Sequence, residues 1–349
     1  MMSGKKKKLA VVLFNLGGPD RPDAVEPFLF NLFSDPAIIR VPQPLRWLIA
    51  KIVSRRRAPL AKEIYAQIGG GSPIVPLTEA QGRALEMALS DQADEVKCFL
   101  AMRYWRPFAD EAAQAVKAWG ADEVVLLPLY PQYSTTTTKS SLKDWDRAAK
   151  VAGLSLPIRT ICCYPVEEGF IAAHAGLLGE ALTKFAPGES VRVLFSAHGL
   201  PKKIVEGGDP YQAQVEATCA AVVAKLGVAK LGLTGLDWIT CYQSRVGPLE
   251  WIGPATDKEI ERAGREGKSL VVVPIAFVSE HSETLVELDM EYGKLAAEAG
   301  VPRYVRVPAL GTEPRFIAGL ANLVRAVRET GGVLCPEEAA GRPCGEEAR

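Results

Sequence analysis

Hydrophobic and polar positions follow two recurring patterns along the chain. Short apolar runs rich in β-branched residues predict buried strands, and Ala-rich amphipathic segments between them predict helices. The predicted strands are Leu9–Leu16, Val96–Met102, Glu123–Leu129, Pro157–Cys162, Val191–Ser196, Asp237–Tyr242, Ser269–Val278 and Arg303–Pro308. Examples of the predicted helices are Glu79–Asp91, Asp110–Trp119, Gly169–Phe185 and Tyr211–Leu226. This alternation predicts an α/β fold with parallel sheets that are covered on both faces.

The order of strand-end sequences in the first half of the chain recurs in the second half. The matching segments are 13–19 with 194–201, 102–107 with 242–248, and 127–129 with 273–275. A recurring order predicts two similar doubly wound, Rossmann-like domains, each with about four strands. We place them at residues 8–187 and 188–330.

Two segments depart from the alternation. Residues 35–76 form an insertion whose middle part combines apolar side chains with the consecutive arginines 55–57. The pattern of this middle part predicts a helix packed on its domain. It also fits an apolar lip that covers an apolar ligand or rests on a membrane surface. Residues 331–349 are rich in Gly, Pro and Glu, so we expect a tail that is ordered only where something holds it.

Composition excludes several classes of function. Lys plus Arg number 41, as do Asp plus Glu, and a net charge of zero gives no indication of a nucleic-acid partner. No segment approaches the roughly 18 to 20 apolar residues that span a bilayer. The N-terminal lysines precede an apolar run, as in a secretory signal, but this run lacks a small-residue cleavage site and leads into a Gly-Gly-Pro turn. We therefore expect a cytoplasmic protein.

One of the three histidines follows a predicted strand directly. His198 stands in the sequence Ser-Ala-His-Gly-Leu-Pro, after the strand at 191–196. Ligands of open parallel sheets bind beyond the carboxyl ends of the strands, so His198 is a candidate site residue. Its position alone also fits a loop histidine that caps a turn. His174 lies in an apolar helical segment, and we expect it to be a structural residue there.

A row of carboxylates follows the long apolar strand of the second half. Glu283, Glu287 and Glu291 recur every four residues, so they would share one face of a helix, with His281 beside the first. The row could be a solvated face, but it begins at a strand end where His198 is also expected. A neutral imidazole that faces carboxylates suits a divalent cation and protons. Too few Cys and His residues converge for a closed structural zinc site.

Other loops at this end of the strands carry groups suited to a large flat ligand. Arg103 could bind a carboxylate substituent of that ligand, or be an ordinary arginine at a strand end. Residues 68–74 lack the ending of a phosphate-binding loop, and no dinucleotide fingerprint follows the first strand, which excludes a dinucleotide-dependent enzyme. The candidate residues are Tyr65, Arg103, Tyr104, Tyr130, Tyr133, Ser134–Thr138, Gln243, Ser244, Arg245 and Trp251.

Seven sequence motifs, in order, resemble those of the ferrochelatases, the enzymes that insert ferrous iron into a porphyrin at the end of haem synthesis. The motifs occupy residues 13–20, 68–74, 127–134, 195–201, 208–211, 246–254 and 274–292. The resemblance implies two Rossmann-type domains with an apolar-lipped cleft, and a lyase that forms protohaem from protoporphyrin IX and Fe(II) with release of two protons. Fe(II) is then a substrate, and the chemistry requires no cofactor. Peripheral membrane contact and a monomer or homodimer fit this reading.

The resemblance also implies roles for individual residues. His198 and Glu283 match the catalytic pair and are the candidate metal ligands, and Glu287, Glu291 and His281 continue as a candidate path for protons or metal. A neutral histidine is a suitable base for the pyrrole N–H protons near pH 7, and which of the pair meets iron first stays open. Tyr65, Arg103, Tyr104 and Trp251 match positions around the porphyrin. The loops add three further candidate porphyrin-binding residues, Tyr133, Ser134 and Gln243.

Cysteines raise a separate question. Three of the seven lie in apolar runs as small hydrophobic residues, namely Cys98, Cys219 and Cys241. Some ferrochelatases hold a [2Fe–2S] cluster near the C-terminus, which needs four thiolates. Cys335 and Cys344 with Cys162 and Cys163 would supply four, although neighbours in a strand point to opposite faces. At the position where animal members have a cluster cysteine, this chain has Thr135. The alternative to a cluster is therefore two buried strand cysteines and a free tail.

Two other functions stay open at the level of sequence. A chelatase for another metal or macrocycle, such as cobalt or coproporphyrin III, would need similar residues. A non-catalytic haem- or metal-binding protein would not need a row of carboxylates that passes protons.

Overall fold

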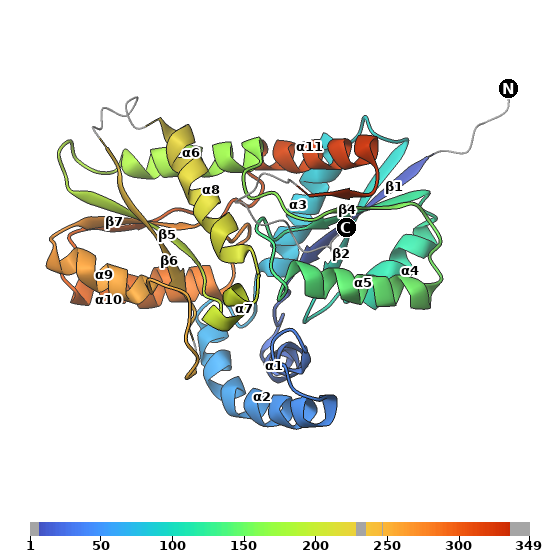
Figure 1. The fold of residues 1–349 in the computed structure, drawn as a ribbon, viewed down its shortest axis with the longest axis horizontal. Helices are drawn as coiled ribbons and strands as arrows, with labels where there is room; N and C mark the ends of the chain where they lie inside the picture. The colour runs from blue at the N-terminus through green and yellow to red at the C-terminus, as the bar shows by residue number, and fades with distance from the viewer. Residues whose placement is uncertain (1–6, 228–234, 246, 336–349) are drawn as a thin grey trace. The chain divides into compact units, whose positions relative to one another are not determined.

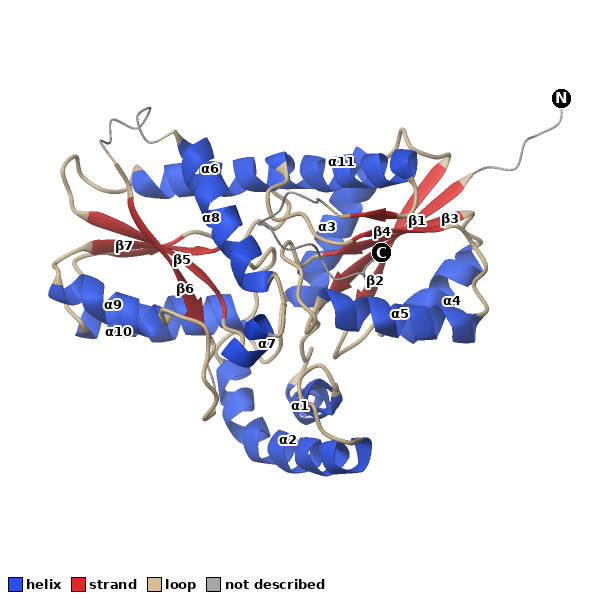
Figure 2. Cartoon of the chain, viewed as in Figure 1, coloured by secondary structure: helices blue, strands red, loops and turns tan. Residues whose placement is uncertain are grey.

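The computed structural model describes residues 7–227, 235–245 and 247–335, which form two compact units. The first unit comprises residues 7–163 and 320–335, and the second comprises residues 164–319. Each unit contains one parallel β-sheet with helices on both of its faces (Figures 1 and 2). The predicted fold class is therefore confirmed, whereas the predicted domain limits stay a prediction.

The first unit is built around a five-stranded sheet in the order β2-β1-β3-β4-β9. Its strands are β1 (Lys8–Asn15), β2 (Glu95–Met102), β3 (Glu123–Pro128), β4 (Ile158–Ile161) and β9 (Val333–Leu334). Strand β1 lies between β2 and β3 and is buried from Leu9 onward, which explains its continuous apolar sequence. The helices that pack on this sheet include α3 (Ile74–Ala88), α4 (Ala109–Trp119), α5 (Thr138–Ala152) and most of α11 (Pro314–Thr330).

The second unit is built around a four-stranded sheet in the order β6-β5-β7-β8. Its strands are β5 (Val191–His198), β6 (Asp237–Gln243), β7 (Ser269–Pro274) and β8 (Tyr304–Arg306). Its helices are α6 (Glu168–Leu182), α7 (Lys202–Glu206), α8 (Tyr211–Leu226), α9 (Thr256–Arg265) and α10 (Tyr292–Glu298), with a π-helical segment, η3 (Glu283–Glu291), before α10. Because β5 is central, the loops after β5, β6 and β7 begin beside one another at the carboxyl edge.

All eight predicted strands are present, and among the described residues one further strand, β9, was not predicted. This strand has two residues and lies in the segment that we expected to be ordered only where something holds it. The N–H of Thr160 donates to the carbonyl of Gly332 at 3.0 Å, and the N–H of Cys162 donates to that of Leu334 at 2.8 Å. These bonds to the neighbourhood of β4 hold the start of the tail, up to Cys335, in the first sheet.

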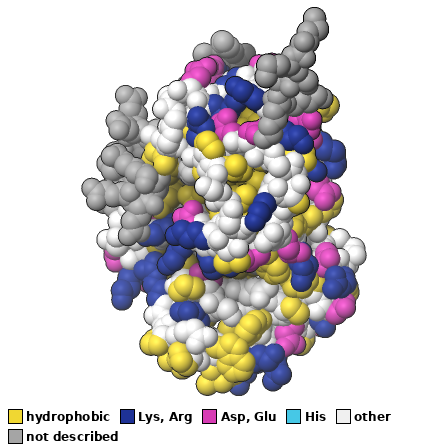
Figure 3. Space-filling view, turned by 90° about the vertical axis from the view of Figure 1, so that its right-hand side faces the viewer, with side chains coloured by type: hydrophobic (Ala, Val, Ile, Leu, Met, Phe, Trp, Pro, Cys, Tyr) yellow, Lys and Arg dark blue, Asp and Glu magenta, His cyan; other side chains and the backbone are white. Residues whose placement is uncertain are grey.

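The predicted insertion, residues 35–76, contains helix α2 (Gln43–Ala66), as the sequence predicted for its middle part. Helix α2 packs against the preceding η1 (Pro22–Ala24) and α1 (Val25–Ser34). The ring of Trp47 packs edge-on against Phe30 of α1, with centroids 6.4 Å apart. Large apolar side chains nevertheless stay exposed on α2, namely Leu45, Trp47, Leu48, Ile52 and Leu60. Figure 3 shows apolar side chains gathered at its lower end, with Lys and Arg side chains beside them. Among the described helices, none is both long and apolar enough to cross a membrane.

Candidate functional site

The carboxyl edge of the second sheet brings an imidazole to a carboxylate. Strand β5 ends at His198, and Nδ1 of this residue lies 2.8 Å from Oε2 of Glu283. Glu283 is the first residue of η3, which follows the loop after the neighbouring strand β7. The structure thus brings together the two residues that the sequence singled out. The side chains remain 39% and 25% exposed, so solvent reaches the pair.

Each member of this pair favours the charged form of the other. Desolvation is the largest effect on His198 and lowers its pKa, yet the charge and hydrogen bond of Glu283, with the charge of Glu287, raise the pKa overall. Desolvation is also the largest effect on Glu283 and raises its pKa, but the charge and hydrogen bond of His198 lower it to about 2. The contact at 2.8 Å therefore favours the imidazolium form of His198 and the carboxylate form of Glu283.

From β6, the strand next to β5, Gln243 supports Glu283 and Glu287 of η3. Its Nε2 donates to the backbone carbonyl of Glu283 and to Oε2 of Glu287, both at 2.9 Å. Its Oε1 accepts a hydrogen bond from Ser196 Oγ at 2.8 Å. The side chain is fully buried, so this candidate porphyrin-binding residue makes contacts within its own unit.

The carboxylate row runs from the interior to the surface. Glu287 is partly buried, and burial followed by the charge of Glu283 raises its pKa. Glu291, the last residue of η3, is exposed. We expected one α-helical face, but η3 is a π-helix, whose hydrogen bonds run from residue i to i+5 and so change the relation between positions four apart. His281 is buried before η3, and its Nε2 lies 3.9 Å from Oε2 of Glu283.

The loop after β5 needs a glycine next to the histidine. A Cβ atom at Gly199 would lie 3.0 Å from the carbonyl oxygen of Gln243 and 3.3 Å from Cε3 of Trp251. The absence of a side chain allows the N–H of Gly199 to donate to that carbonyl at 2.9 Å. Trp251, which pairs with Pro201 in a β-bridge, is thereby held half-buried close to the residues that follow His198.

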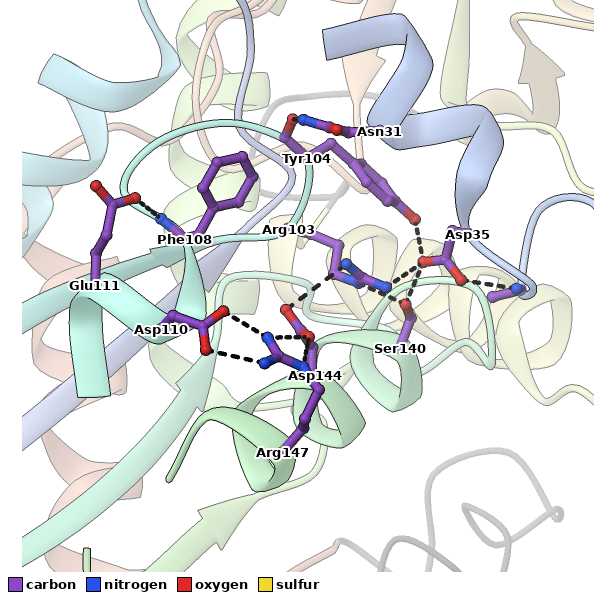
Figure 4. Close-up of polar contacts among 11 residues, drawn as sticks. Asn31, Asp35, Arg103, Tyr104, Phe108, Asp110, Glu111, Ser140, Asp144 and Arg147 are labelled. Carbon is purple, nitrogen blue, oxygen red and sulfur yellow. Dashed lines mark hydrogen bonds and ion pairs between the residues drawn. The ribbon is translucent and has the colours of Figure 1, made fainter. Parts of the chain in front are cut away.

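The candidate porphyrin-binding residues Arg103 and Tyr104 converge on a buried carboxylate in the first unit (Figure 4). Nη2 of Arg103 lies 2.7 Å from Oδ2 of Asp35, and the hydroxyl groups of Tyr104 and Ser140 donate to the same oxygen at 2.9 and 2.6 Å. Arg103 also donates from Nε to Ser140 Oγ at 2.7 Å. No sequence pattern indicated Asp35, beyond an acidic residue after an apolar helix.

A polar hollow of about 260 Å³ lies beside Arg103 and Asp35. Its lining also includes Arg147, which makes two hydrogen bonds to Asp110, at 2.9 and 2.6 Å, and one to Asp144 (Figure 4). Both arginines that line the hollow are therefore already paired with carboxylates. The remaining candidates of this unit, Tyr65, Tyr133 and Ser134, are buried.

Three of the four candidate cluster cysteines come together in the first unit. The Sγ atoms of Cys162, Cys163 and Cys335 lie within 4.8 Å of one another. The first two are fully buried, and Cys335 is partly exposed. The objection that strand neighbours point to opposite faces does not hold, because β4 ends at Ile161 and both cysteines follow it. Cys344 lies outside the described residues.

The remaining cysteines are not part of this group. Cys219 and Cys241 are fully buried, as expected, and burial raises the pKa of Cys241 to about 12. Cys98, which we expected to be buried, is partly exposed.

Comparisons with known proteins agree on one family. The sequence model of the ferrochelatase family matches residues 8–327. A ferrochelatase of Caulobacter vibrioides (strain NA1000 / CB15N) is 56% identical over 344 residues, which cover 98% of this chain and 96% of that protein. A ferrochelatase of Phenylobacterium zucineum (strain HLK1) is 56% identical over 337 residues, 94% of this chain and 96% of that protein.

A solved structure shows the same fold. The structure of SirB from Bacillus subtilis with Fe3+ is similar with a TM-score of 0.52 at 15% identity, over 93% of this chain and 98% of that chain. At this level of identity the likeness supports the architecture of two parallel sheets and nothing finer.

Proposed function

The chain belongs to the ferrochelatase family and inserts Fe(II) into protoporphyrin IX in haem synthesis, and we propose that His198 and Glu283 carry out this insertion as a lyase reaction. The observation that carries the proposal is the 2.8 Å contact between His198 Nδ1 and Glu283 Oε2 at the carboxyl edge of the second sheet. Ligands of open α/β sheets bind at such edges.

Insertion requires two pyrrole N–H protons to leave as one Fe(II) ion enters. We assign the protons to His198, since an imidazole is a suitable base near neutral pH and the raised pKa of His198 strengthens it. The proton that His198 shares with Glu283 must first pass to solvent, which reaches the pair, so that the imidazole can accept a pyrrole proton. Glu283, whose low pKa keeps it ionised, then supplies a carboxylate oxygen for the metal substrate, and His198 supplies a nitrogen.

The protons then leave along the carboxylates of η3. Glu287 is partly buried and Glu291 is exposed at the far end of the segment, so together they lead from the interior to solvent. His281, 3.9 Å from Glu283, is the remaining member of this proposed path.

Seven residues form the proposed porphyrin-binding set: Tyr65, Arg103, Tyr104, Tyr133, Ser134, Gln243 and Trp251. Trp251 is the best supported of them for direct contact, since its half-buried ring lies by the loop after His198 and offers an aromatic face. The internal hydrogen bonds of Gln243, Arg103 and Tyr104 favour a supporting role for these three.

A [2Fe–2S] cluster would be held by Cys162, Cys163, Cys335 and Cys344. The donor set fits, because three thiols within 4.8 Å of one another provide soft sulfur ligands. A bound cluster would supply a one-electron redox centre and would cross-link the segment after β9 to the residues after β4.

Contact with a membrane surface is proposed for helix α2. Its exposed apolar side chains, together with Arg55, Arg56 and Arg57, have the composition of a helix that lies on an anionic bilayer. The predicted cytoplasmic location and the monomeric or homodimeric state remain proposals.

Anaerobic insertion of Zn(II) or Fe(II) into protoporphyrin IX, followed by absorbance, tests the proposed reaction. The parent protein should insert metal, and His198→Ala should lose nearly all activity while it still binds porphyrin. Coproporphyrin III in the same assay tests the alternative substrate, which a higher kcat/KM for coproporphyrin would favour. A folded parent that binds porphyrin without inserting metal would indicate a carrier.

A further inference from the structure

Strand β2 forms one edge of the first sheet. Among the described strands it pairs with β1 alone, so its other side carries backbone groups that the sheet does not use. The N–H and C=O of one residue point to the same side of a strand, and that side alternates along the chain. Because the N–H of Cys98 bonds outside the sheet, Val96 and Leu100 present their backbone groups to the same outer edge. A row of such groups is a template for pairing with another strand.

The side chain of Glu86 occupies the middle of this edge. Its Oε1 accepts a hydrogen bond from the N–H of Cys98 at 2.7 Å. Glu86 lies on α3, and Gly82, one turn earlier, allows that helix to approach β2, since a Cβ atom there would lie 3.2 Å from Cβ of Cys98. Further along the edge, the N–H of Met102 donates to the carbonyl of Pro107 at 2.7 Å. Two of the outward donors are therefore already bonded within the first unit.

The exposed part of this edge suits pairing with β2 of a second copy of the chain. Identical strands related by a twofold axis run antiparallel. With the axis at Cys98, Val96 would face Leu100 of the second copy, and Lys97 would face Phe99. The first pair is apolar, and the second is a cation beside a ring, a contact that Lys97 already makes within its own strand at 5.3 Å from the ring centroid of Phe99. Val96 and Leu100 are partly exposed and Lys97 is exposed, so solvent reaches this edge.

We propose that Glu86 prevents β2 from pairing with β2 of a second copy of this chain. Such pairing needs the N–H of Cys98, because the residue on the twofold axis exchanges two hydrogen bonds with its counterpart. Glu86 already accepts from that N–H. Its carboxylate also occupies the place that the carbonyl oxygen of the incoming strand would need. Charged side chains at a sheet edge oppose edge-to-edge association in this way.

Glu86→Ala frees the N–H of Cys98 and should allow the two edges to pair. The mass measured by sedimentation velocity should then rise above that of the parent as the protein concentration increases. We expect self-association to strengthen by at least about tenfold, since two hydrogen bonds become available across the axis. Hydrogen exchange of residues 96–100 should slow at the higher concentrations. Glu86→Gln keeps an acceptor oxygen and should retain the mass of the parent.

A second substitution separates edge pairing from misfolding. Val96→Pro removes an outward N–H without loss of a bond to β1, and proline is tolerated at such positions of edge strands. The double variant with Glu86→Ala and Val96→Pro should therefore recover the mass of the parent. Glu79→Ala breaks an exposed ion pair with Arg83 on the same helix and should behave as the parent does. The parent's mass in Glu86→Ala at every concentration, association that persists with Val96→Pro, or equal association in Glu79→Ala would overturn the inference.

Discussion

His198 and Glu283 are 85 residues apart in the sequence, yet Nδ1 of the first lies 2.8 Å from Oε2 of the second. Two neighbouring parallel strands, β5 and β7, produce this contact. The histidine is the last residue of β5, and the glutamate is the first residue of η3, which follows β7 in the chain. The loops that follow them can change in sequence while the strand register keeps both residues at one edge. The predictions below start from this pair and extend to the remaining features of the two units.

Replacement of Glu283 by Gln should abolish most of the insertion activity while the chain stays folded. The amide keeps the size of the side chain but carries no charge, so the metal loses a ligand and His198 loses the group that raises its pKa. We expect kcat to fall by a factor of about 100 or more, within the range for loss of a positioned acid or base. Zinc insertion assays over a range of pH measure this effect.

Glu291→Gln is the matched control for this prediction. The change is chemically identical but lies at the exposed end of η3, and activity should fall much less than in Glu283→Gln. Equal losses of activity in the two variants would show that the effect of Glu283→Gln does not depend on the contact with His198.

His174 should make the protein less stable in mild acid. Burial lowers the pKa of His174 to about 3, against about 6.5 in an unfolded chain. Below pH 6.5 the unfolded state therefore binds a proton that the folded state does not, and stability falls as the pH falls towards 3. At pH 5 the loss is about 2 kcal/mol relative to pH 7.5.

Chemical unfolding of the parent and of His174→Leu at pH 7.5 and pH 5 tests this prediction. The variant lacks the titrating group, so its stability should depend less on pH. If both proteins lose the same stability between the two pH values, the acid sensitivity comes from other groups.

Asp35 should contribute strongly to the stability of the first unit. Its carboxylate is 4% exposed and accepts hydrogen bonds from Tyr104 and Ser140 besides its ion pair with Arg103. Asp35→Ala leaves the Arg103 guanidinium without its buried partner, at a cost of about 3 kcal/mol. Asp110→Ala, in the exposed pair with Arg147, should cost less than about 1 kcal/mol. Thermal unfolding would refute the prediction if both variants lost similar stability.

Cys335→Ser should remove bound iron and acid-labile sulfide from the purified protein, with loss of the visible absorption of a [2Fe–2S] cluster. Cys98→Ser, outside the thiol group, should retain all three properties. A colourless, iron-free parent prepared under anaerobic conditions would contradict the cluster proposal.

Substitution of both Trp47 and Leu48 by Ser should weaken binding to vesicles that contain anionic phospholipids. These side chains are 51% and 48% exposed on α2, and the arginines nearby favour a negative surface. We expect at least about tenfold weaker binding in a sedimentation assay, since two large apolar groups are lost.

Met87→Ser, at an exposed apolar position on α3, is the control and should bind vesicles as the parent does. Added salt should weaken the binding of the parent, because the arginines contribute through screened charges. Parent-like binding of the Trp47 and Leu48 variant would remove α2 from consideration.

The strands and the His198–Glu283 pair could be predicted from the sequence because both depend on local patterns. Continuous apolar runs identify buried parallel strands, and residues after such strands meet at one edge. Strand β9 was missed because two residues carry no periodic signal, and its pairing with β4 depends on a partner more than 170 residues away, as in the Thr160–Gly332 bond.

The side-chain partners inside each unit were less accessible. The pairing of Arg103 with Asp35 joins segments far apart in the chain, and no local pattern specifies such a pair. The π-helical form of η3 was missed because the spacing of Glu283, Glu287 and Glu291 fits an α-helix equally well. The positive φ of Ser244, +58°, was missed because serine, unlike glycine, gives no local signal of that backbone conformation.

Strand β9 and most of α11 have a consequence for the order of folding during translation. Residues 320–335 belong to the first unit but are synthesised after the whole of the second. A ribosome that has completed residue 163 has therefore produced a sheet whose β4 edge is still uncovered, and such an edge is open to mispairing with other chains. The nascent first unit must keep this edge unpaired until translation of the second unit has finished.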